Sequence, residues 1–253
     1  MNAIEDNEFR RAWQRVGGYF GENGRWPNPQ LVLCVSAHWV TKGWGLTALQ
    51  SPPTIHDFGG FTPELHAQQY PAPGSPGFAK QISKIIHQPT KLDYEAVNAY
   101  QEGQTEDAGE NLFLDHQEWG FDHGTWSVLK PMFPLAEIPV IQMSIDYSAP
   151  MQSHFDLGHQ LTKLRDLGVL IVGSGNTVHN LRSMVRSAPN TDAFDWNKAF
   201  DDWVAKCINE RDLKGLMEFQ KLGEIAKLAH PSFEHYLPIL YTAGAVLGLS
   251  PIH

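Results

Sequence analysis

Three apolar runs constrain the fold of this chain more than any other feature. They read "LVLCVSA" at 31–37, "IPVIQMSID" at 138–146 and "VLIVGSGN" at 169–176. Short, nearly continuous apolar runs are typical of strands that are covered on both faces of a sheet. Segments with helical spacing lie between and around them, so strands and helices alternate along the chain. The sequence therefore predicts an α/β fold, with a central sheet and helices on both of its faces.

Helical spacing is clearest in four parts of the chain. The pattern predicts a helix at 7–20 that stops at a glycine pair, and an amphipathic helix at 77–87. It also predicts a helix at 153–168 that is closed by Gly168, and a mostly helical end at 200–248. Residues 51–76 are rich in Pro, Gly and aromatic side chains, which predicts a long ordered loop of the kind that often lines a site. The polar, acidic stretch 98–111 indicates a surface insertion.

Size and charge exclude several functions. A length of 253 residues with 42% hydrophobic content fits one large domain. The formal charge is −9 and no basic block occurs, so the chain lacks the electrostatic signature of a nucleic-acid binder. No apolar stretch approaches the roughly 20 residues that span a bilayer, and the acidic start is unlike a signal peptide. We therefore expect a soluble cytoplasmic protein that binds neither nucleic acid nor membrane; its oligomeric state is left open.

Histidine, rather than cysteine, is the side chain in excess. Two cysteines, Cys34 and Cys207, lie in apolar patterns and are expected in the core, whereas histidines number 12. Five of these histidines have polar neighbours in helical or loop contexts and are interpreted as surface or hydrogen-bonded side chains: His66, His87, His116, His154 and His159.

Other histidines occupy positions typical of a site. His38 ends one apolar strand and His179 closely follows another, and the carboxyl ends of parallel strands are where α/β proteins bind ligands. His123 lies among glycines and tryptophans in "WGFDHGTW", and His235 follows Glu234 in "PSFEHYLP". Imidazoles and a carboxylate that converge from distant segments indicate a divalent transition metal. Spacing and chemistry alone thus predict a metal-dependent α/β enzyme.

Two rival sites are weaker. Ser174 in "GSGN" is a candidate nucleophile, but the G-x-S-x-G pattern is absent. The same "GSGN" resembles a phosphate-binding loop, but no lysine follows it. The compact zinc motif H-E-x-x-H is also absent. None of these patterns is a stronger candidate for the functional site than the dispersed histidines.

Six ordered motifs resemble one known family. They are "SAHW", "PPTIHDFGGF", "YPAPGSP", "EWGFDHGTWSVL", "GSGNTVHNLR" and "EHYLP", which begin at residues 36, 52, 70, 118, 173 and 234. Together they resemble extradiol ring-cleavage dioxygenases of the protocatechuate 4,5-dioxygenase type, in the 4,5-DOPA dioxygenase branch. The resemblance implies one catalytic domain over residues 1–253, with a mixed central sheet. It also implies a non-haem Fe(II) site that opens a small catechol with O2, inserting oxygen beside the diol.

Residue roles follow from the same resemblance. His38 and His235 are expected as metal ligands, with Glu234 a less favoured alternative to His235. His179 is expected beside the metal as ligand or acid–base residue, and His123 toward the substrate as a catalytic residue. Zn(II) can occupy the same ligands, but it has no redox chemistry and could not support the reaction. No other cofactor site is expected.

The chain departs from the family pattern at its ends. Family members usually begin with a strand ending in His-Gly-Ser-Pro just before a Met-Asn pair, and that histidine is a metal ligand; this chain starts at Met1. We expect that the first strand and the closing strands are missing, and that His56 is a candidate to complete the ligand set. A catalytically silent relative that binds metal or catechol is the alternative function. A metal-dependent hydrolase on the same sheet is a weaker one.

Overall fold

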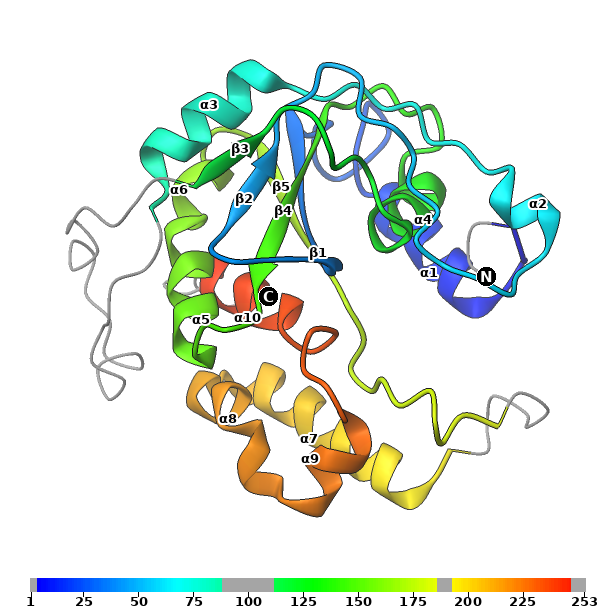
Figure 1. Ribbon diagram of the computed structural model, residues 1–253, viewed down its shortest axis with the longest axis vertical. Coiled ribbons are helices and arrows are strands. Elements are labelled where there is room, and N and C mark those ends of the chain that lie inside the picture. Colours follow the sequence, from blue (N-terminus) through cyan, green and yellow to red (C-terminus); the bar gives the residue numbers. More distant parts are fainter. Residues whose placement is uncertain (1–3, 88–111, 186–192, 247–253) are drawn as a thin grey trace.

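A five-stranded sheet forms the centre of the molecule in the computed structural model, which describes residues 4–87, 112–185 and 193–246 (Figure 1). The strand order is β3-β2-β4-β1-β5, and the strands are β1 (Leu31–Thr41), β2 (Gly45–Thr47), β3 (Phe113–Asp115), β4 (Val140–Asp146) and β5 (Val169–Ser174). β4 and β5 flank β1 in parallel, whereas β2 is antiparallel to β4. The predicted α/β fold with a mixed sheet is confirmed.

The three apolar runs form the parallel centre of this sheet. Val32 pairs with Val140 on one side and with Leu170 on the other. Alternate residues of a strand face opposite sides, so Leu31 and Leu33 enter one core cluster while Val32 enters another. All three strands therefore present their carboxyl ends at one edge of the sheet, as the sequence predicts.

The end of β1 differs from the prediction. We predicted a strand that ends at His38, but β1 continues to Thr41, and its register against β4 shifts between Val35 and Val40. His38 therefore lies inside the strand, within an irregular stretch. Irregularities of this kind bend a strand and change the direction of a side chain beside a site. The apolar pattern gave no sign of this register shift, because apolar residues continue past His38 and Trp39 is buried like the residues before it.

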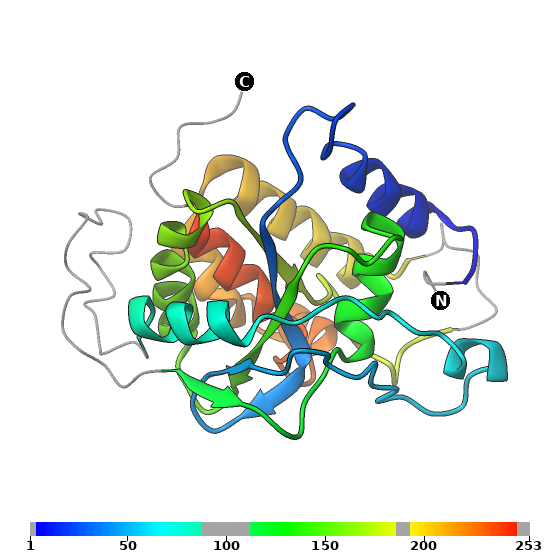
Figure 2. The ribbon, with the colours of Figure 1, turned by 90° about the horizontal axis from the view of Figure 1, so that it is seen from above.

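One face of the sheet is covered by α1 (Glu8–Gly17) and α4 (His123–Met132) (Figures 1 and 2). A Cβ atom on Gly17 would lie 2.1 Å from the carbonyl oxygen of Met132, so this glycine lets the two helices approach closely. Asp122 caps α4 by accepting a hydrogen bond from the backbone N–H of Thr125 at 3.0 Å. The cap fixes the start of α4, which carries His123.

The other face is covered by α3 (Pro76–Ile85), α5 (Met151–Gln160) and α10 (Pro238–Ala245). The predicted single helix at 153–168 is wrong in one respect: it is divided into α5 and the short α6 (Thr162–Arg165). The chain then turns at Gly168, whose φ of +76° suits glycine. Periodicity does not reveal such a break, since apolar spacing continues across it.

The C-terminal half adds a further layer of helices beside α5 and α10 (Figure 1). It consists of α7 (Asp195–Glu210), α8 (Leu213–Met217), the 3-10 helix η2 (Phe219–Leu222) and α9 (Glu224–Ala229), while α2 (Pro63–His66) lies in the long loop after β2. Cys34 and Cys207 are buried, as predicted. Among the described residues, no helix combines the length and apolarity that a membrane crossing requires. The predicted insertion at 98–111 and the last residues, 248–253, lie outside the described ranges.

Candidate metal centre

Four imidazoles lie in a row at the carboxyl edge of the parallel strands. The ring centroids of His123 and His38 are 3.9 Å apart, those of His38 and His235 are 4.9 Å apart, and those of His235 and His179 are 3.5 Å apart. They come from α4, β1 and the segments before α10 and after β5. The structure thus brings together the four histidines that the sequence singled out.

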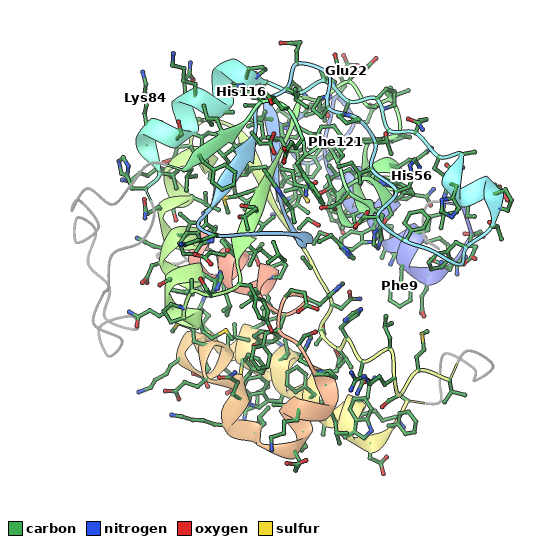
Figure 3. The ribbon with its side chains drawn as sticks, in the orientation of Figure 1. Phe9, Glu22, His56, Lys84, His116 and Phe121 are labelled. Carbon is green, nitrogen blue, oxygen red and sulfur yellow. The ribbon has the colours of Figure 1, made fainter. Side chains whose placement is uncertain are left out.

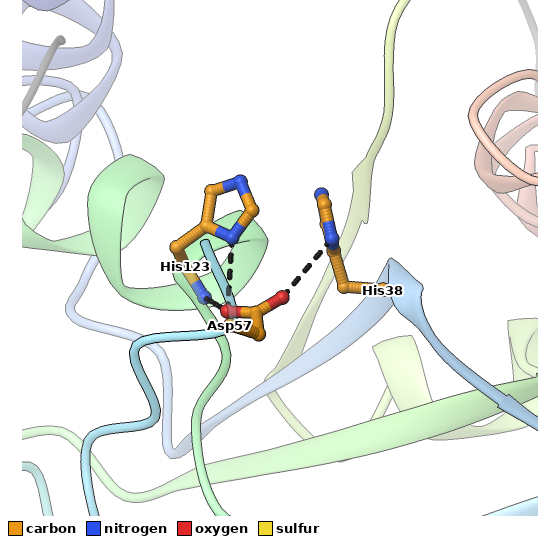
Figure 4. Close-up of side chains that lie close together, drawn as sticks. All are labelled: His38, Asp57 and His123. Atoms are coloured by element: carbon orange, nitrogen blue, oxygen red, sulfur yellow. Dashed lines mark hydrogen bonds and ion pairs between the residues drawn. The ribbon is translucent and has the colours of Figure 1, made fainter. Parts of the chain in front are cut away.

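Asp57 joins two of these imidazoles (Figure 4). Its Oδ2 atom lies 3.0 Å from Nδ1 of His38, and its Oδ1 atom lies 2.9 Å from Nδ1 of His123. Oδ1 also accepts a hydrogen bond from the backbone N–H of His123 at 2.8 Å. Figure 4 shows the other ring nitrogen of each imidazole on the side away from the carboxylate.

The loop that carries Asp57 is held tightly although it has no regular secondary structure. The backbone N–H of Ile55 donates to the carbonyl of Phe121 at 2.7 Å, and that of Phe121 donates to the carbonyl of Pro53 at 2.8 Å. The indole N–H of Trp126 donates to the carbonyl of Ile55 at 2.9 Å. The prediction of an ordered loop is confirmed, and the loop is tied to the start of α4.

Burial and hydrogen bonding act in opposite directions on the pKa values here. Burial alone would raise the pKa of Asp57, but the hydrogen bonds from His123 and His38 hold it well below its ordinary value. Burial likewise would lower the pKa of His38, but the hydrogen bond to Asp57 raises it. Asp57 is therefore ionised at neutral pH and can only accept hydrogen bonds.

His235 has its own acceptor. Its Nδ1 atom lies 2.8 Å from Oδ1 of Asn176, and the backbone N–H of Asn176 donates to the carbonyl of His235 at 2.9 Å. Burial, together with the neighbouring imidazoles, lowers the pKa of His235 to about 3. His235 is therefore neutral, with a proton on Nδ1 and a lone pair on Nε2.

His179 lies flat against His235, and this limits how the pair could bind metal. The two rings are 11° from parallel. A ligand lone pair lies in the plane of its ring, so two closely stacked rings cannot both direct lone pairs at one ion without moving. The rings of His38 and His235 are 88° apart, and planes at that angle can meet at a common ion. Burial lowers the pKa of His179 and favours its neutral form.

The candidate ligand atoms form two groups. His38, Asp57 and His123 make one, and His179, Glu234 and His235 make the other; within each group the atoms lie within 4.8 Å of one another. His38 and His235, which we expected to share a metal, thus belong to adjoining groups. Imidazole with carboxylate suits iron and zinc better than calcium or magnesium, so this donor set fits the metal that the resemblance implies.

A network of buried, hydrogen-bonded polar side chains lies next to the candidate metal centre. The carboxylate of Asp122 accepts hydrogen bonds from the hydroxyl of Ser36 at 2.7 Å and from the side-chain amide of Gln142. The Thr125 hydroxyl donates to Oε1 of Gln142 at 2.7 Å. Burial raises the pKa of Asp122. The network connects β1, β4 and α4, the elements that hold His38 and His123 in place.

The rival sites find no support in these contacts. The hydroxyl of Ser174 is buried and donates to the carbonyl of Gly124 at 2.6 Å. Asn176, in the same "GSGN" stretch, accepts from His235. The ring of His56 points to the carbonyl of Gln68, with Nε2 at 2.9 Å from the oxygen, so this residue belongs to neither ligand group.

The histidines that we set aside lie elsewhere. His116 lies near the β3 side of the sheet, with Nδ1 3.2 Å from the carbonyl oxygen of Ala48 (Figure 3). His154 is fully buried, which polar neighbours in the sequence did not suggest, and its Nδ1 atom is 2.7 Å from the Tyr241 hydroxyl. Neither belongs to the two ligand groups of the described residues.

Asp57 is the site residue that sequence reasoning missed, and Asn176 contacts His235 rather than His179, to which it is closer in the sequence. Asp57 stands inside the "PPTIHDFGGF" motif, directly after His56, and Asn176 is the last residue of the run "VLIVGSGN" at 169–176. Their positions in these motifs were the only signal. What makes them important is the imidazole that each contacts, and those imidazoles come from distant segments.

Comparisons with known proteins agree on one family. Residues 6–249 match the family described as the catalytic LigB subunit of aromatic ring-opening dioxygenase. A 4,5-DOPA dioxygenase extradiol of Escherichia coli is 41% identical, over 100% of this chain and 83% of that protein. A protein of the same name from Beta vulgaris is 32% identical, over 97% of this chain and 82% of that protein. The crystal structure of the uncharacterized protein JW3007 from E. coli superposes with a TM-score of 0.73 at 35% identity, and covers 98% of this chain and 86% of that one.

Proposed function

Because the chain belongs to the LigB family of aromatic ring-opening dioxygenases, we propose that it cleaves a small catechol beside its diol with O2, using Fe(II). The observation that carries the proposal is the row of four imidazoles at the carboxyl edge of the sheet. Relatives named 4,5-DOPA dioxygenase make a DOPA-like catechol the first substrate to test.

His38 and His235 are the proposed metal ligands, and Glu234, which belongs to the same ligand group as His235, supplies a carboxylate. The perpendicular rings of the two histidines support this assignment. A 2-His-1-carboxylate set that leaves open positions is typical of non-haem Fe(II) oxygenases. When bound, Fe(II) supplies the redox chemistry that O2 requires and that Zn(II) lacks.

His179 is proposed as the acid–base residue rather than as a third ligand. Its ring is stacked on His235, so its lone pairs do not lie in a plane that passes through an ion bound by His235. Burial lowers its pKa, so a neutral imidazole is available to accept a proton from a catechol hydroxyl and return it later. His123, whose Nδ1–H is held by Asp57, is left with Nε2 to contact the substrate.

The function is tested with the full chain loaded with Fe(II) without oxygen. Oxygen uptake and ring-opening absorbance are then followed with DOPA and other catechols, and incorporation of two atoms from 18O2 identifies a dioxygenase. His179→Gln should lower kcat by about 10²–10⁴-fold while iron content stays unchanged. Catechol binding without oxygen uptake would identify a silent relative. Loss of iron in His179→Gln would make His179 a ligand instead.

A further inference from the structure

We propose that Asp57 is a positioning residue that keeps the ring proton of His38 on Nδ1, so that Nε2 offers its lone pair to the metal. The proposal rests on the metal site of the proposed function, but it does not depend on any reaction with oxygen. Acceptors that contact the second nitrogen of a ligand histidine generally set its tautomer and increase its basicity.

The contacts of Asp57 leave little choice of tautomer. An ionised carboxylate has no hydrogen to donate, so each imidazole nitrogen within hydrogen-bond distance must carry the proton. Oδ2 lies 3.0 Å from Nδ1 of His38, and no other contact to Oδ2 occurs among the described residues. Oδ1 receives both the ring N–H and the backbone N–H of His123. The two oxygens therefore have separate partners.

The backbone also holds the carboxylate in place. Residues just before Asp57 are hydrogen-bonded to Phe121 and Trp126, and the negative charge lies at the N-terminus of α4, where the helix dipole is favourable. A Cβ atom on Gly120 would lie 2.0 Å from the carbonyl oxygen of Pro53, so the loop approaches the start of α4 as closely as glycine allows. The loop backbone therefore cannot carry the carboxylate away from His38 and His123 without breaking several contacts.

This arrangement predicts an asymmetric effect of Asp57→Asn. The amide oxygen can keep the Oδ1 position, where two N–H groups of His123 point at it. The amide nitrogen then takes the Oδ2 position and directs a hydrogen at Nδ1 of His38. His38 must accept it, so its own proton moves to Nε2 and blocks the ligand lone pair. His123 should keep its tautomer.

The test measures tautomers and metal affinity separately. Histidine labelled with 15N in the full chain, at an alkaline pH where the rings are neutral, reports by NMR which nitrogen of each ring carries hydrogen. Zinc, a diamagnetic probe, is titrated by calorimetry. In the unaltered protein, His38 should be the Nδ1–H form. In Asp57→Asn it should change to Nε2–H, and zinc affinity should fall about 10–100-fold.

Asp115→Asn is the matched control. Asp115, the last residue of β3, also accepts backbone hydrogen bonds through its carboxylate: its Oδ1 atom accepts from the N–H groups of Gln117 and Glu118. Unlike Asp57, it belongs to neither ligand group of the described residues. This variant should leave zinc affinity and both tautomers unchanged. Melting temperatures of both variants report any general loss of folding.

Several results would overturn the proposal. One is an Nε2–H form of His38 in the unaltered protein, which decides the question even if Asp57→Asn does not fold. Others are an unchanged tautomer with lost zinc binding, which would make Asp57 merely structural, and a changed tautomer with full zinc affinity. Absence of oxygen uptake in the Fe(II)-loaded protein would instead refute the proposed function and leave this inference standing.

Discussion

At the scale of single residues, the contact between His235 and Asn176 should control metal binding as well. Asn176→Ala removes the acceptor for the Nδ1 proton of His235, so the ring can rotate or change tautomer. We expect zinc affinity to fall about 10-fold with little change in melting temperature. Asn176→Asp keeps an acceptor at the same place and should retain most of the affinity. Equal losses in the two variants would contradict the role.

Asp156 of α5 gives a prediction about pH and stability. Its side chain is 3% exposed, and burial raises its pKa to about 7, while no hydrogen bond or ion pair reaches it from the described residues. The folded protein therefore holds this proton more tightly than the unfolded chain. Stability should fall as pH rises from about 4 to 7, because folding then buries a charge.

Asp156→Asn should abolish this fall in stability with rising pH. Above pH 7 it should increase the free energy of unfolding, on the order of 2–4 kcal/mol. Urea unfolding at a series of pH values measures the effect. Asp166→Asn, at an exposed position, is the control and should leave the pH dependence as it is. A parallel pH dependence in Asp156→Asn and the unaltered protein would show that the Asp156 carboxyl is solvated.

The histidines of the site could be predicted, whereas their partners could not. His38 and His179 follow apolar strand runs, and His123 and His235 lie in aromatic, proline- or glycine-rich motifs, so local sequence marks them. The importance of Asp57 lies in contacts with β1 and α4, and no local pattern records those. The roles assigned to the four histidines stay predictions until the variants are measured.

At the scale of elements, the contact between α4 and β1 controls where His38 lies. A Cβ atom on Gly124 would lie 2.6 Å from the Ser36 hydroxyl oxygen and 3.1 Å from Cδ2 of His38. Gly124→Ala should therefore push the start of α4 away from β1. We expect a loss of about 1–3 kcal/mol in unfolding free energy and weaker zinc binding, measured by urea unfolding and calorimetry.

Gly77→Ala is the matched control for Gly124→Ala. Gly77 lies in the first turn of α3, and a Cβ atom there would meet nothing within 4 Å. Because alanine favours a helix over glycine, this variant should gain about 0.5–1 kcal/mol and bind zinc normally. A normal zinc affinity in Gly124→Ala would show that His38 adapts to the added methyl group.

Element prediction succeeded where one pattern dominated a segment. The parallel strands β1, β4 and β5 are long apolar runs, and α1 and α3 have helical spacing, which in α1 stops at a glycine pair. β2 and β3 have three residues each, too few for a period of two to be recognised. The division between α5 and α6 and the shift in β1 arise from packing, so spacing alone did not predict them.

At the scale of the whole molecule, the proposed ligands His38 and His235 come from opposite ends of the sequence. His38 lies in β1, and His235 lies in the segment that leads into α10, which packs against β5 and α5. A metal bound to both would therefore connect the central sheet to the C-terminal helices. Because the unfolded chain does not hold these imidazoles together, binding should stabilise the folded state.

Zinc at about 100 times its Kd should then raise the melting temperature by about 5–10 °C. His38→Ala and His235→Ala should each fold without metal but lose most of that increase, and a chelator should reverse it in the unaltered protein. His116→Ala is the control, since His116 lies near β3 away from both ligand groups, and it should keep the full increase. A full increase in both ligand variants would place the metal elsewhere. Loss in only one would leave that histidine as a ligand and remove the connection between the sheet and the C-terminal helices.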